Sequence, residues 1–350
     1  MASEAAPGDF RGVRVAFDAM GGDHGPAEIV PGALAHARAH PADELILVGD
    51  TTAVARIAGA LPPNVRIVHA GSVVEMHEHP ARALIRKKDS SIVVATELVK
   101  SGEADAVVTA GHTGAGMAAG KLILGTLPGI DRPALAVQMT TDSGPMVLID
   151  IGANPDSTPE HLAQYARMGA IFAEQVLGVA NPRVALLSIG EEKGKGDARI
   201  QRATELLDAT SLNFVGNIEG RDLPKHLADV VVTDAVAGNV VIKFYEGLST
   251  FIFDLWRAEF RGSLRGRLAY LLMRPGIRRI RAVFDYETQG GSPLLGVQGT
   301  VIITHGSASR RMIGFACEVA ARMARARVPD LIAEALAADG AVTKPEEVAR

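Results

Sequence analysis

One stretch, ADAVVTAGHTGAGMAAGKLILG (residues 104–125), most constrains how this chain folds. Residues 104–109 are apolar and rich in valine, which predicts a short buried strand. Residues 110–116 form a turn of glycine and other small residues, and residues 115–125 have the Ala, Leu and Met content of a helix. Such a turn leaves free backbone N–H groups at the positive end of the helix dipole. The stretch therefore predicts an anion site, for phosphate for instance, or a plain turn whose glycines only allow close packing.

Strand-like and helix-like segments alternate along the rest of the chain. Strands are predicted at residues 13–18, 45–49, 65–69, 134–139, 146–151, 183–189, 229–233 and 300–304. Helices are predicted at residues 26–40, 51–60, 81–101 and 158–177, the last capped by Ser157 and Thr158 with Glu160 placed for a capping box. The alternation, with short Gly/Pro connections, predicts an α/β fold with a largely parallel, buried sheet.

The composition allows a large core, because 47% of the 350 residues are hydrophobic. That is enough for one large α/β domain or for two. No stretch is long or polar enough to be a clear linker, so we expect a single domain over residues 11–330 and a loose tail at residues 340–350.

Charge and cysteine content indicate the compartment and exclude one class of partner. A net charge of −4 gives no general attraction to nucleic acid, so a charged partner must meet a local patch. The single cysteine, Cys317, rules out a disulfide framework within the chain, and its apolar neighbours predict a packed core thiol. The N-terminal segment has no signal-peptide features, and no run of 18 apolar residues occurs. We therefore expect a cytosolic protein.

Residues 244–286 break the alternation. They hold nine of the fifteen aromatic residues, and between Arg257 and Arg281 there are eight arginines and one acid, Glu259. Apolar residues recur at helical spacing, which predicts a hairpin of amphipathic helices. Such a pair lies on an anionic bilayer or forms a subunit interface with solvated arginines, and both can hold. The residues expected at the membrane are Trp256, Leu268, Leu271 and Leu272.

Three segments that follow predicted strands hold candidate site residues: residues 188–197, 217–222 and 233–243. Ligands of open parallel sheets collect beyond the carboxyl ends of the strands, so we expect these loops to face the turn at residues 111–116. Lysines beside backbone N–H groups make a phosphate pocket, and an asparagine is an uncharged donor for an oxyanion. Each lysine taken alone also fits a solvated surface charge. The side chains concerned are Lys193, Lys195, Asn239 and Lys243.

Several well-known functional motifs are incomplete or absent. Gly22 and Gly25 match the last two glycines of G-x-G-x-x-G, but Met20 stands in place of the first, which argues against a dinucleotide site. His77 and His79 lie in no CxxC or HExxH frame, so no metal is expected. The motifs G-x-S-x-G of hydrolases and G-x-x-x-x-G-K-[ST] of ATP-binding loops do not occur.

A series of phrases resembles the bacterial phosphate acyltransferase of phospholipid synthesis, the PlsX family. They are FDAMGGDHGP (17–26), RKKDSS (86–91), DAVVTAGHTGA (105–115), GIDRPALA (129–136), IGANPDSTPEHL (151–162), IGEEKGKG (189–196), GNIEGRD (216–222), DAVAGNVVIK (234–243) and GGSPLLG (290–296). They span nearly the whole chain in order, which is far more specific than any single glycine motif.

The resemblance implies a doubly wound α/β/α sandwich related to phosphotransacetylases and to isocitrate- and isopropylmalate-type dehydrogenases. It implies reversible transfer of a fatty acyl group from acyl carrier protein to inorganic phosphate, giving acyl phosphate for the synthesis of phosphatidic acid. It also implies a homodimer whose hairpin touches the inner face of the cell membrane, near the glycerol-3-phosphate acyltransferase that uses acyl phosphate. No cofactor, metal or nucleic acid is implied.

The resemblance also assigns site residues. Lys195 of the IGEEKGKG loop and Asn239 of the GNVV stretch are the catalytic residues that it implies. His112 stands where the family has asparagine, and Ala235 and Ala237 replace glycine and threonine, which affects the shape of the pocket rather than the reaction. The residues expected around phosphate are Gly111, His112, Thr113, Gly114, Lys193 and Lys243.

The chemistry suits these residues, because phosphate is a nucleophile at neutral pH and a thiolate is a good leaving group. The site need supply only proximity and charge stabilisation. Acyl carrier protein is strongly acidic, so we expect it to dock on a local basic patch. The densest patch outside the hairpin consists of Arg82, Arg86, Lys87 and Lys88.

Two other functions are weighed against this one. A dehydrogenase on the related fold needs a dinucleotide site and an acidic metal cluster, and neither can be assembled from the sequence. A non-catalytic, membrane-bound scaffold for acyl carrier protein leaves the polar loops unexplained.

Overall fold

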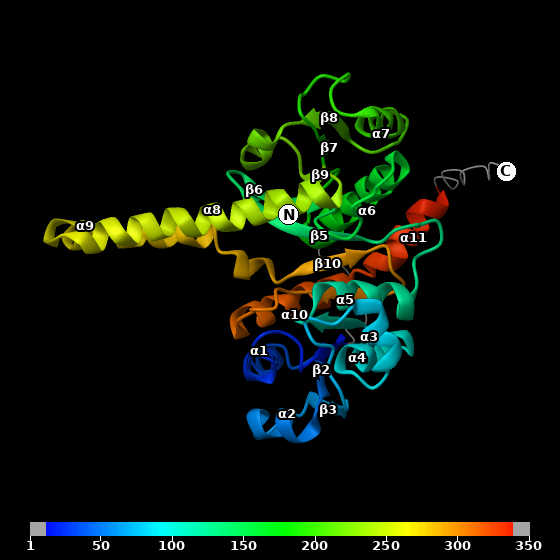
Figure 1. Cartoon of the computed structure of the whole chain (residues 1–350), viewed down its shortest axis with the longest axis vertical. Helices are drawn as coiled ribbons and strands as arrows, with labels where there is room; N and C mark the ends of the chain where they lie inside the picture. The colour runs from blue at the N-terminus through cyan, green and yellow to red at the C-terminus, as the bar shows by residue number, and fades with distance from the viewer. Residues whose placement is uncertain (1–11, 339–350) are drawn as a thin grey trace, which may run out of the picture. The chain divides into compact units, whose positions relative to one another are not determined.

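The computed structural model describes residues 12–338, which form two compact units (Figure 1). Unit 1 comprises residues 12–125 and 297–327, and unit 2 comprises residues 126–296 and 328–338. The single domain expected over residues 11–330 stays a prediction, and the tail expected at residues 340–350 lies outside the described residues.

Unit 1 contains a parallel sheet with the strand order β3-β2-β1-β4-β11. Its strands are β1 (Arg14–Asp18), β2 (Glu44–Gly49), β3 (Val65–His69), β4 (Ala106–Thr109) and β11 (Thr300–Ile303). Its helices are α1 (Pro26–Ala39), α2 (Thr51–Ala58), α3 (Pro80–Arg86), α4 (Ser91–Lys100), α5 (Thr113–Ala119), which continues as a π-helical turn (Gly120–Leu124), and α10 (Arg310–Arg325). The central strands are apolar runs buried on both faces, because α1 and α10 cover one face and α4 and α5 the other (Figure 1).

Unit 2 contains a mixed sheet with the order β10-β5-β6-β9-β7-β8, in which β5 is antiparallel to both neighbours and the last four strands are parallel. Its strands are β5 (Ala134–Thr141), β6 (Gly144–Ile149), β7 (Val184–Leu187), β8 (Phe214–Ile218), β9 (Val230–Val232) and β10 (Ser292–Leu295). Its helices are α6 (Pro159–Leu177), α7 (Ala198–Asp208), α8 (Ala235–Gly262), α9 (Leu264–Val283), α11 (Val328–Ala338) and two 3-10 turns, Gly220–Lys225 and Tyr286–Gln289. The predicted α/β class with a largely parallel sheet is confirmed.

The predicted strands and helices are found within a few residues of their expected positions, with three differences. β8 and β10 were not predicted, because β8 contains Gly216 and β10 is four residues long and contains Pro293. The helix after β4 begins at Thr113 rather than at residue 115. The segment expected as a loop at residues 233–243 is largely the start of α8.

The capping box of α6 differs from the one predicted. Thr158 alone is the N-cap, and its hydroxyl accepts from the N–H of His161, whose Nδ1 accepts from the N–H of Thr158. Glu160 takes no part, because Ser157 does not cap the helix. The Ser157 hydroxyl instead donates to the carbonyl of Asn154 at 2.9 Å.

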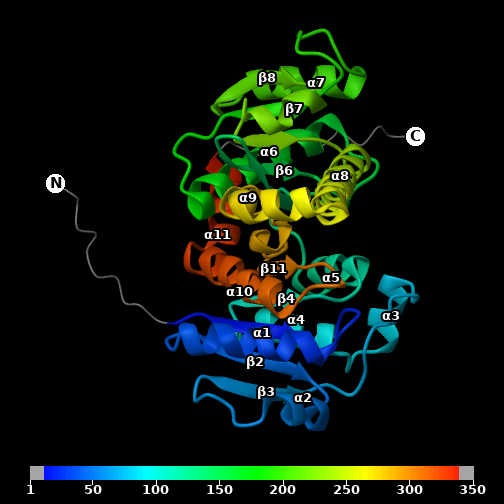
Figure 2. The same ribbon diagram turned by 90° about the vertical axis from the view of Figure 1, so that its left-hand side faces the viewer.

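The predicted helical hairpin is present as α8 and α9, which pack against each other and project from the strands of unit 2 (Figures 1 and 2). Its core is aromatic: Phe253 stacks edge-on with Trp256 and with Phe284, at centroid separations of 5.7 and 5.9 Å. A second pair, Phe260 and Tyr270, packs at 5.7 Å nearer the hairpin turn. Aromatic contacts between the two helices therefore hold the hairpin together.

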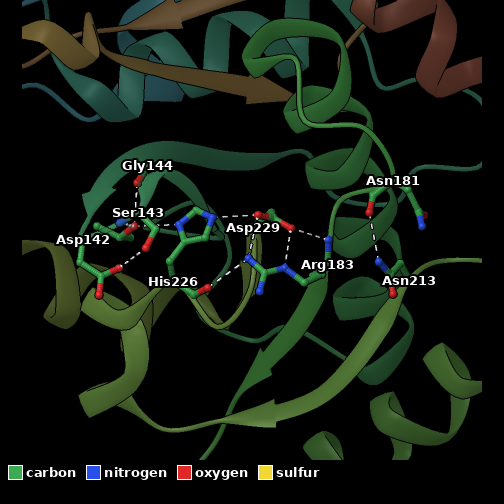
Figure 3. A network of polar contacts seen from close by, with 9 residues as sticks. Asp142, Ser143, Gly144, Asn181, Arg183, Asn213, His226 and Asp229 are labelled. Atoms are coloured by element: carbon green, nitrogen blue, oxygen red, sulfur yellow. Dashed lines mark hydrogen bonds and ion pairs between the residues drawn. The ribbon is translucent and has the colours of Figure 1, made fainter.

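A polar network secures the amino ends of β7 and β9 in unit 2 (Figure 3). The Arg183 guanidinium and backbone N–H bond the carboxylate of Asp229, and Nε2 of His226 lies 2.9 Å from the same carboxylate. Nδ1 of His226 lies 2.7 Å from the hydroxyl of Thr141, which donates to Gly144 at the turn between β5 and β6. Burial alone would raise the pKa of Asp229, but these hydrogen bonds hold it below its ordinary value. The network stabilises the amino ends of these strands. The loops at their carboxyl ends are therefore the better candidates for an active site.

Candidate active site

The carboxyl ends of β6, β7 and β9 form one edge of the unit 2 sheet. These strands are parallel neighbours in register and end at Ile149, Leu187 and Val232. The chain continues from them into residues 150–157, into the loop at residues 188–197 and into α8. Parallel strands bring such segments together, and Lys195 and Asn239 lie on two of them.

Asp150 organises the segment that follows β6. The carboxylate is fully buried and accepts from the N–H groups of Leu135, Gly152, Ala153 and Asn154 at 2.8–3.1 Å, and from the side-chain amide of Asn154 at 3.1 Å. Burial raises its pKa more than these hydrogen bonds lower it. Asp150 was not predicted from the sequence, although an aspartate directly after a buried apolar strand was a signal for it.

Asn239 lies on the second turn of α8, not on a loop as predicted. Its side-chain Nδ2 donates to the carbonyl of Ile151 at 3.2 Å, and the residue is otherwise exposed. Gly238 permits this, because a Cβ there would lie only 2.0 Å from the carbonyl oxygen of Asp150. Any larger residue would therefore push α8 away from the end of β6.

The three candidate lysines of unit 2 differ in their partners. Nζ of Lys193 donates to Asp208, the last residue of α7, at 2.8 Å. Nζ of Lys243 pairs with Glu246 at 3.2 Å on the surface of α8. Lys195 is exposed, and its ammonium has no hydrogen-bond or ion-pair partner within residues 12–338. The structure therefore favours Lys195 for an anionic ligand.

In unit 1, the turn after β4 offers fewer free donors than the sequence suggested. The N–H of Gly111 donates to the hydroxyl of Thr109 at 3.1 Å, and the N–H of Gly114 donates to Nδ1 of His112 at 3.0 Å. His112 is the N-cap of α5, so its imidazole takes a donor that an anion would otherwise use. The exposed Thr113 and His112 itself remain at the surface of the turn.

A buried carboxylate supports this turn from the neighbouring strand. Asp18, at the end of β1, accepts from the hydroxyl of Thr109 at 2.8 Å, and burial raises its pKa beyond what its hydrogen bonds offset. Gly21 lies against Gly111, where an added Cβ would be 2.9 Å from the Gly111 nitrogen. The glycines after β1 and β4 thus allow two turns of unit 1 to pack closely, which was the alternative weighed from the sequence.

The expected carrier-docking patch on and after α3 is partly neutralised. Glu78 pairs with Lys87 at 2.6 Å and with Arg86 at 3.1 Å, and Lys87 also donates to the carbonyl of Val73. Arg82 and Lys88 are exposed and have no such partner among the described residues. Two of the four cations are therefore available for an acidic ligand.

The expected membrane residues divide into two groups. Leu268, Leu271 and Leu272 of α9 are 61%, 62% and 77% exposed. Trp256 is partly buried, and its ring packs edge-on against Phe253 of the same helix. Trp256 therefore belongs largely to the hairpin core. None of the helices within residues 12–338 is long and apolar enough to cross a bilayer.

The described residues contain one group with the donors of a metal site, His36, His40 and Asp43 at the end of α1. Arg325 already donates to both oxygens of Asp43, at 2.5 and 2.6 Å. A cation would have to displace this guanidinium, so the group is better described as a buried ion pair with stacked histidines beside it. Cys317 is fully buried, which raises the pKa of its thiol and confirms it as a core residue.

Comparison with known proteins identifies the family. Residues 13–331 match the family described as "Fatty acid synthesis protein". The chain belongs to this family. It is 51% identical over 311 residues to the phosphate acyltransferase of Desulfitobacterium hafniense (strain Y51), covering 88% of this chain and 92% of that protein. It is 46% identical over 322 residues to the phosphate acyltransferase of Myxococcus xanthus (strain DK1622), covering 90% and 91%. The family resemblance and the prediction of an acyltransferase of lipid synthesis are confirmed.

Solved structures with the same fold are more distant in sequence. A phosphotransacetylase from Streptococcus pyogenes superimposes with a TM-score of 0.61 at 18% identity, covering 90% of this chain and 95% of that one. The EutD phosphotransacetylase from Staphylococcus aureus gives 0.57 at 16% identity, covering 89% and 94%. These likenesses concern the fold alone.

Proposed function

We propose that the protein transfers a fatty acyl group from acyl carrier protein to inorganic phosphate and forms acyl phosphate for glycerophospholipid synthesis. The observation that carries this proposal is the match of nine-tenths of the chain to phosphate acyltransferases. The residues at the carboxyl edge of unit 2 support it, because an unpaired lysine and an exposed amide lie on neighbouring segments there.

The reaction needs no covalent enzyme intermediate. A phosphate oxygen attacks the thioester carbonyl carbon, the new C–O bond forms, and negative charge develops on the carbonyl oxygen. The C–S bond then breaks, and its electron pair leaves with sulfur as the thiolate of the carrier. Because both reactants are anionic or become so, catalysis depends on placing them together and stabilising charge.

Lys195 and Asn239 have the properties that these steps need. The free ammonium of Lys195 pairs with the phosphate dianion. The amide of Asn239 has two N–H donors, of which one is held by Ile151, so the other is available to the carbonyl oxygen as it gains charge. Lys193 and Lys243 are weaker candidates for the phosphate contact, because Asp208 and Glu246 already offset their charges.

We propose separately that the turn at Gly111, His112, Thr113 and Gly114 in unit 1 contacts phosphate. Its support is its position at the carboxyl end of β4, where ligands of parallel sheets bind, and the two glycines that it contains. With Gly111 and Gly114 already hydrogen-bonded, the backbone of His112 and Thr113 and the Thr113 hydroxyl provide the contacts.

Acyl carrier protein, as an acidic partner, docks on the basic patch near α3 in this proposal. The contact is centred on Arg82 and Lys88, the two cations without an ion-pair partner, with Ile85 exposed between them. Charge reversal of Arg82 and Lys88 together should weaken carrier binding and reduce its dependence on salt. Unchanged affinity and salt dependence would place the carrier elsewhere.

We also propose that the hairpin brings the enzyme to the inner face of the cell membrane from the cytoplasm, and that the active species is a homodimer. The exposed leucines of α9 and the arginines of the hairpin support the membrane contact. Acyl phosphate then passes to an acyltransferase that uses it to acylate glycerol 3-phosphate.

The test is the incubation of purified protein with inorganic phosphate and acyl carrier protein loaded with a labelled acyl chain. We expect labelled acyl phosphate and free carrier thiol in equal amounts, both dependent on phosphate. Carrier binding without phosphate-dependent release would support the scaffold function instead. Reduction of a nicotinamide dinucleotide by a small hydroxy acid would support a dehydrogenase.

A further inference from the structure

Arg199 joins three segments of unit 2 at the edge that carries the proposed site. It lies in the first turn of α7, and its side chain is 27% exposed. Nη2 donates to Asp234 at 2.8 Å and to Asp197 at 3.4 Å, and Nη1 donates to the carbonyl of Ser157 at 3.4 Å. One guanidinium therefore contacts the starts of α7 and α8 and the segment that follows β6.

Both aspartates are helix N-caps that use one oxygen for the helix and turn the other toward Arg199. Oδ1 of Asp197 accepts from the N–H of Ile200 at 2.9 Å, and its Oδ2 faces the guanidinium. Oδ1 of Asp234 accepts from the N–H groups of Val236 and Ala237 at 2.9 and 3.0 Å, and its Oδ2 bonds Arg199. Arg199 thus links the first turns of two helices through their caps.

These two helix starts carry the residues proposed to act in the reaction. Lys195 precedes the Asp197 cap by two residues, and Asn239 follows the Asp234 cap by five. The Asp234 pair is shielded, with side-chain exposures of 27% and 14%, so solvent screens it less than it screens a surface pair. Arg199 itself is committed to three acceptors and is not placed to touch a substrate.

We propose that Arg199 is a positioning residue that fixes α8, and with it Asn239, relative to the Lys195 loop. The inference rests on the proposed function and adds a residue to it that the sequence analysis did not identify. Without the guanidinium, the Asp234 carboxylate loses its only cation among the described residues, and the start of α8 moves against the end of β6. Displacements of about 1 Å at a catalytic group lower rates by up to about a hundredfold.

The test uses Arg199→Ala with Arg202→Ala as the matched control. Arg202 lies on the same helix, is exposed and, within residues 12–338, pairs only with Glu205 at 2.7 Å. We expect kcat for phosphate-dependent acyl transfer to fall about tenfold to a hundredfold in Arg199→Ala, with a smaller change in the KM for phosphate, and to stay within twofold in Arg202→Ala. Arg199→Lys, which keeps the charge without the fork of donors, should recover part of the loss.

A double-mutant cycle separates positioning from general destabilisation. If Arg199 acts through Asn239, adding Arg199→Ala to Asn239→Ala should lower kcat by less than threefold, whereas independent effects would multiply. Equal kcat for Arg199→Ala and the wild type, or full multiplication in the double variant, would overturn the inference.

A measurement that does not need activity distinguishes this inference from the proposed function. Amide hydrogen exchange at Val236 and Ala237 should be at least threefold faster in Arg199→Ala, and unchanged in Arg202→Ala. An inactive wild-type protein would refute the proposed function while this exchange difference still tests the positioning. Unchanged exchange at the start of α8 would refute the positioning, whatever the activity.

Discussion

The two halves of α8 differ in the range of their contacts. At its start, Asp234 pairs with Arg199 on α7, and Gly238 and Asn239 contact the segment that follows β6. Beyond Phe244 the helix contacts mainly α9, and its ion pairs, such as Arg257 with Asp254, join residues three apart. Long-range polar contacts give the first half one fixed geometry, which catalysis requires. The second half presents apolar residues outward, which suits a surface that meets a membrane or a second subunit.

The first prediction concerns the start of α8 and is measured as turnover. Asn239→Ala removes the proposed oxyanion donor and should lower turnover by roughly tenfold to a thousandfold, with the fold intact and vesicle binding unchanged. Asn213→Ala is the control, because the side-chain amide of Asn213 bonds only the carbonyl of Asn181 among the described residues, near the amino end of the strands (Figure 3). Turnover equal to wild type in folded Asn239→Ala would remove that role.

The second prediction concerns the hairpin rather than the start of α8. Leu271→Glu places a charge on the exposed face of α9 and should release the protein from anionic vesicles, with turnover on soluble substrates kept within about twofold. Each arginine adds at most about 1 kcal/mol of attraction, so binding also needs the apolar face. Leu61→Glu, at an exposed leucine of unit 1, is the control in vesicle flotation.

Sedimentation of the same variants distinguishes the two roles of the hairpin. Loss of the dimer in Leu271→Glu, with no binding of the wild type to vesicles, would make the hairpin a subunit interface only. A variant that stays dimeric and bound to vesicles would remove Leu271 from both surfaces.

Lys193 and Lys195 lie two residues apart in one loop but differ in their partners. Lys195→Ala removes an unpaired cation and should raise the KM for phosphate about tenfold, the size of a lost charge-assisted contact. Lys193→Ala removes a cation already paired with Asp208, so its KM should change by less than threefold. A larger effect at Lys193 than at Lys195 would reverse the assignment.

The smallest expected effect is confined to the hairpin. Trp256→Ala removes an edge-on aromatic contact worth about 0.5–1.5 kcal/mol beyond its buried area. Amide exchange within α8 beyond residue 250 and within α9 should become roughly threefold to tenfold faster, while the start of α8 and turnover stay unchanged. Faster exchange at Val236 as well would show that the two halves of α8 are coupled.

Much of the fold follows from local pattern. Apolar runs such as those of β1 and β4 predict buried strands wherever they lie in the chain, and the spacing of aromatic and leucine residues predicts the hairpin. The start of α8 could not be predicted in this way. The first turns of Ala235–Gly262 contain a glycine, an asparagine and three valines, which favour a helix only weakly. The Asp234 cap and the packing of Gly238 against Asp150 provide the stabilisation that the local sequence lacks.

Sequence patterns were sufficient to predict the family, the α/β class, the amphipathic hairpin and the residue types at the strand ends. The tertiary structure was needed to show that Lys193 is paired whereas Lys195 has no partner among the described residues, that His112 caps α5, that Trp256 packs against Phe253, and that Arg199 joins two helix caps. The physical reason is the range of the interactions. Periodicity and turn chemistry act over a few residues, whereas a salt bridge between Arg199 and Asp234 depends on where distant segments of the chain are brought together.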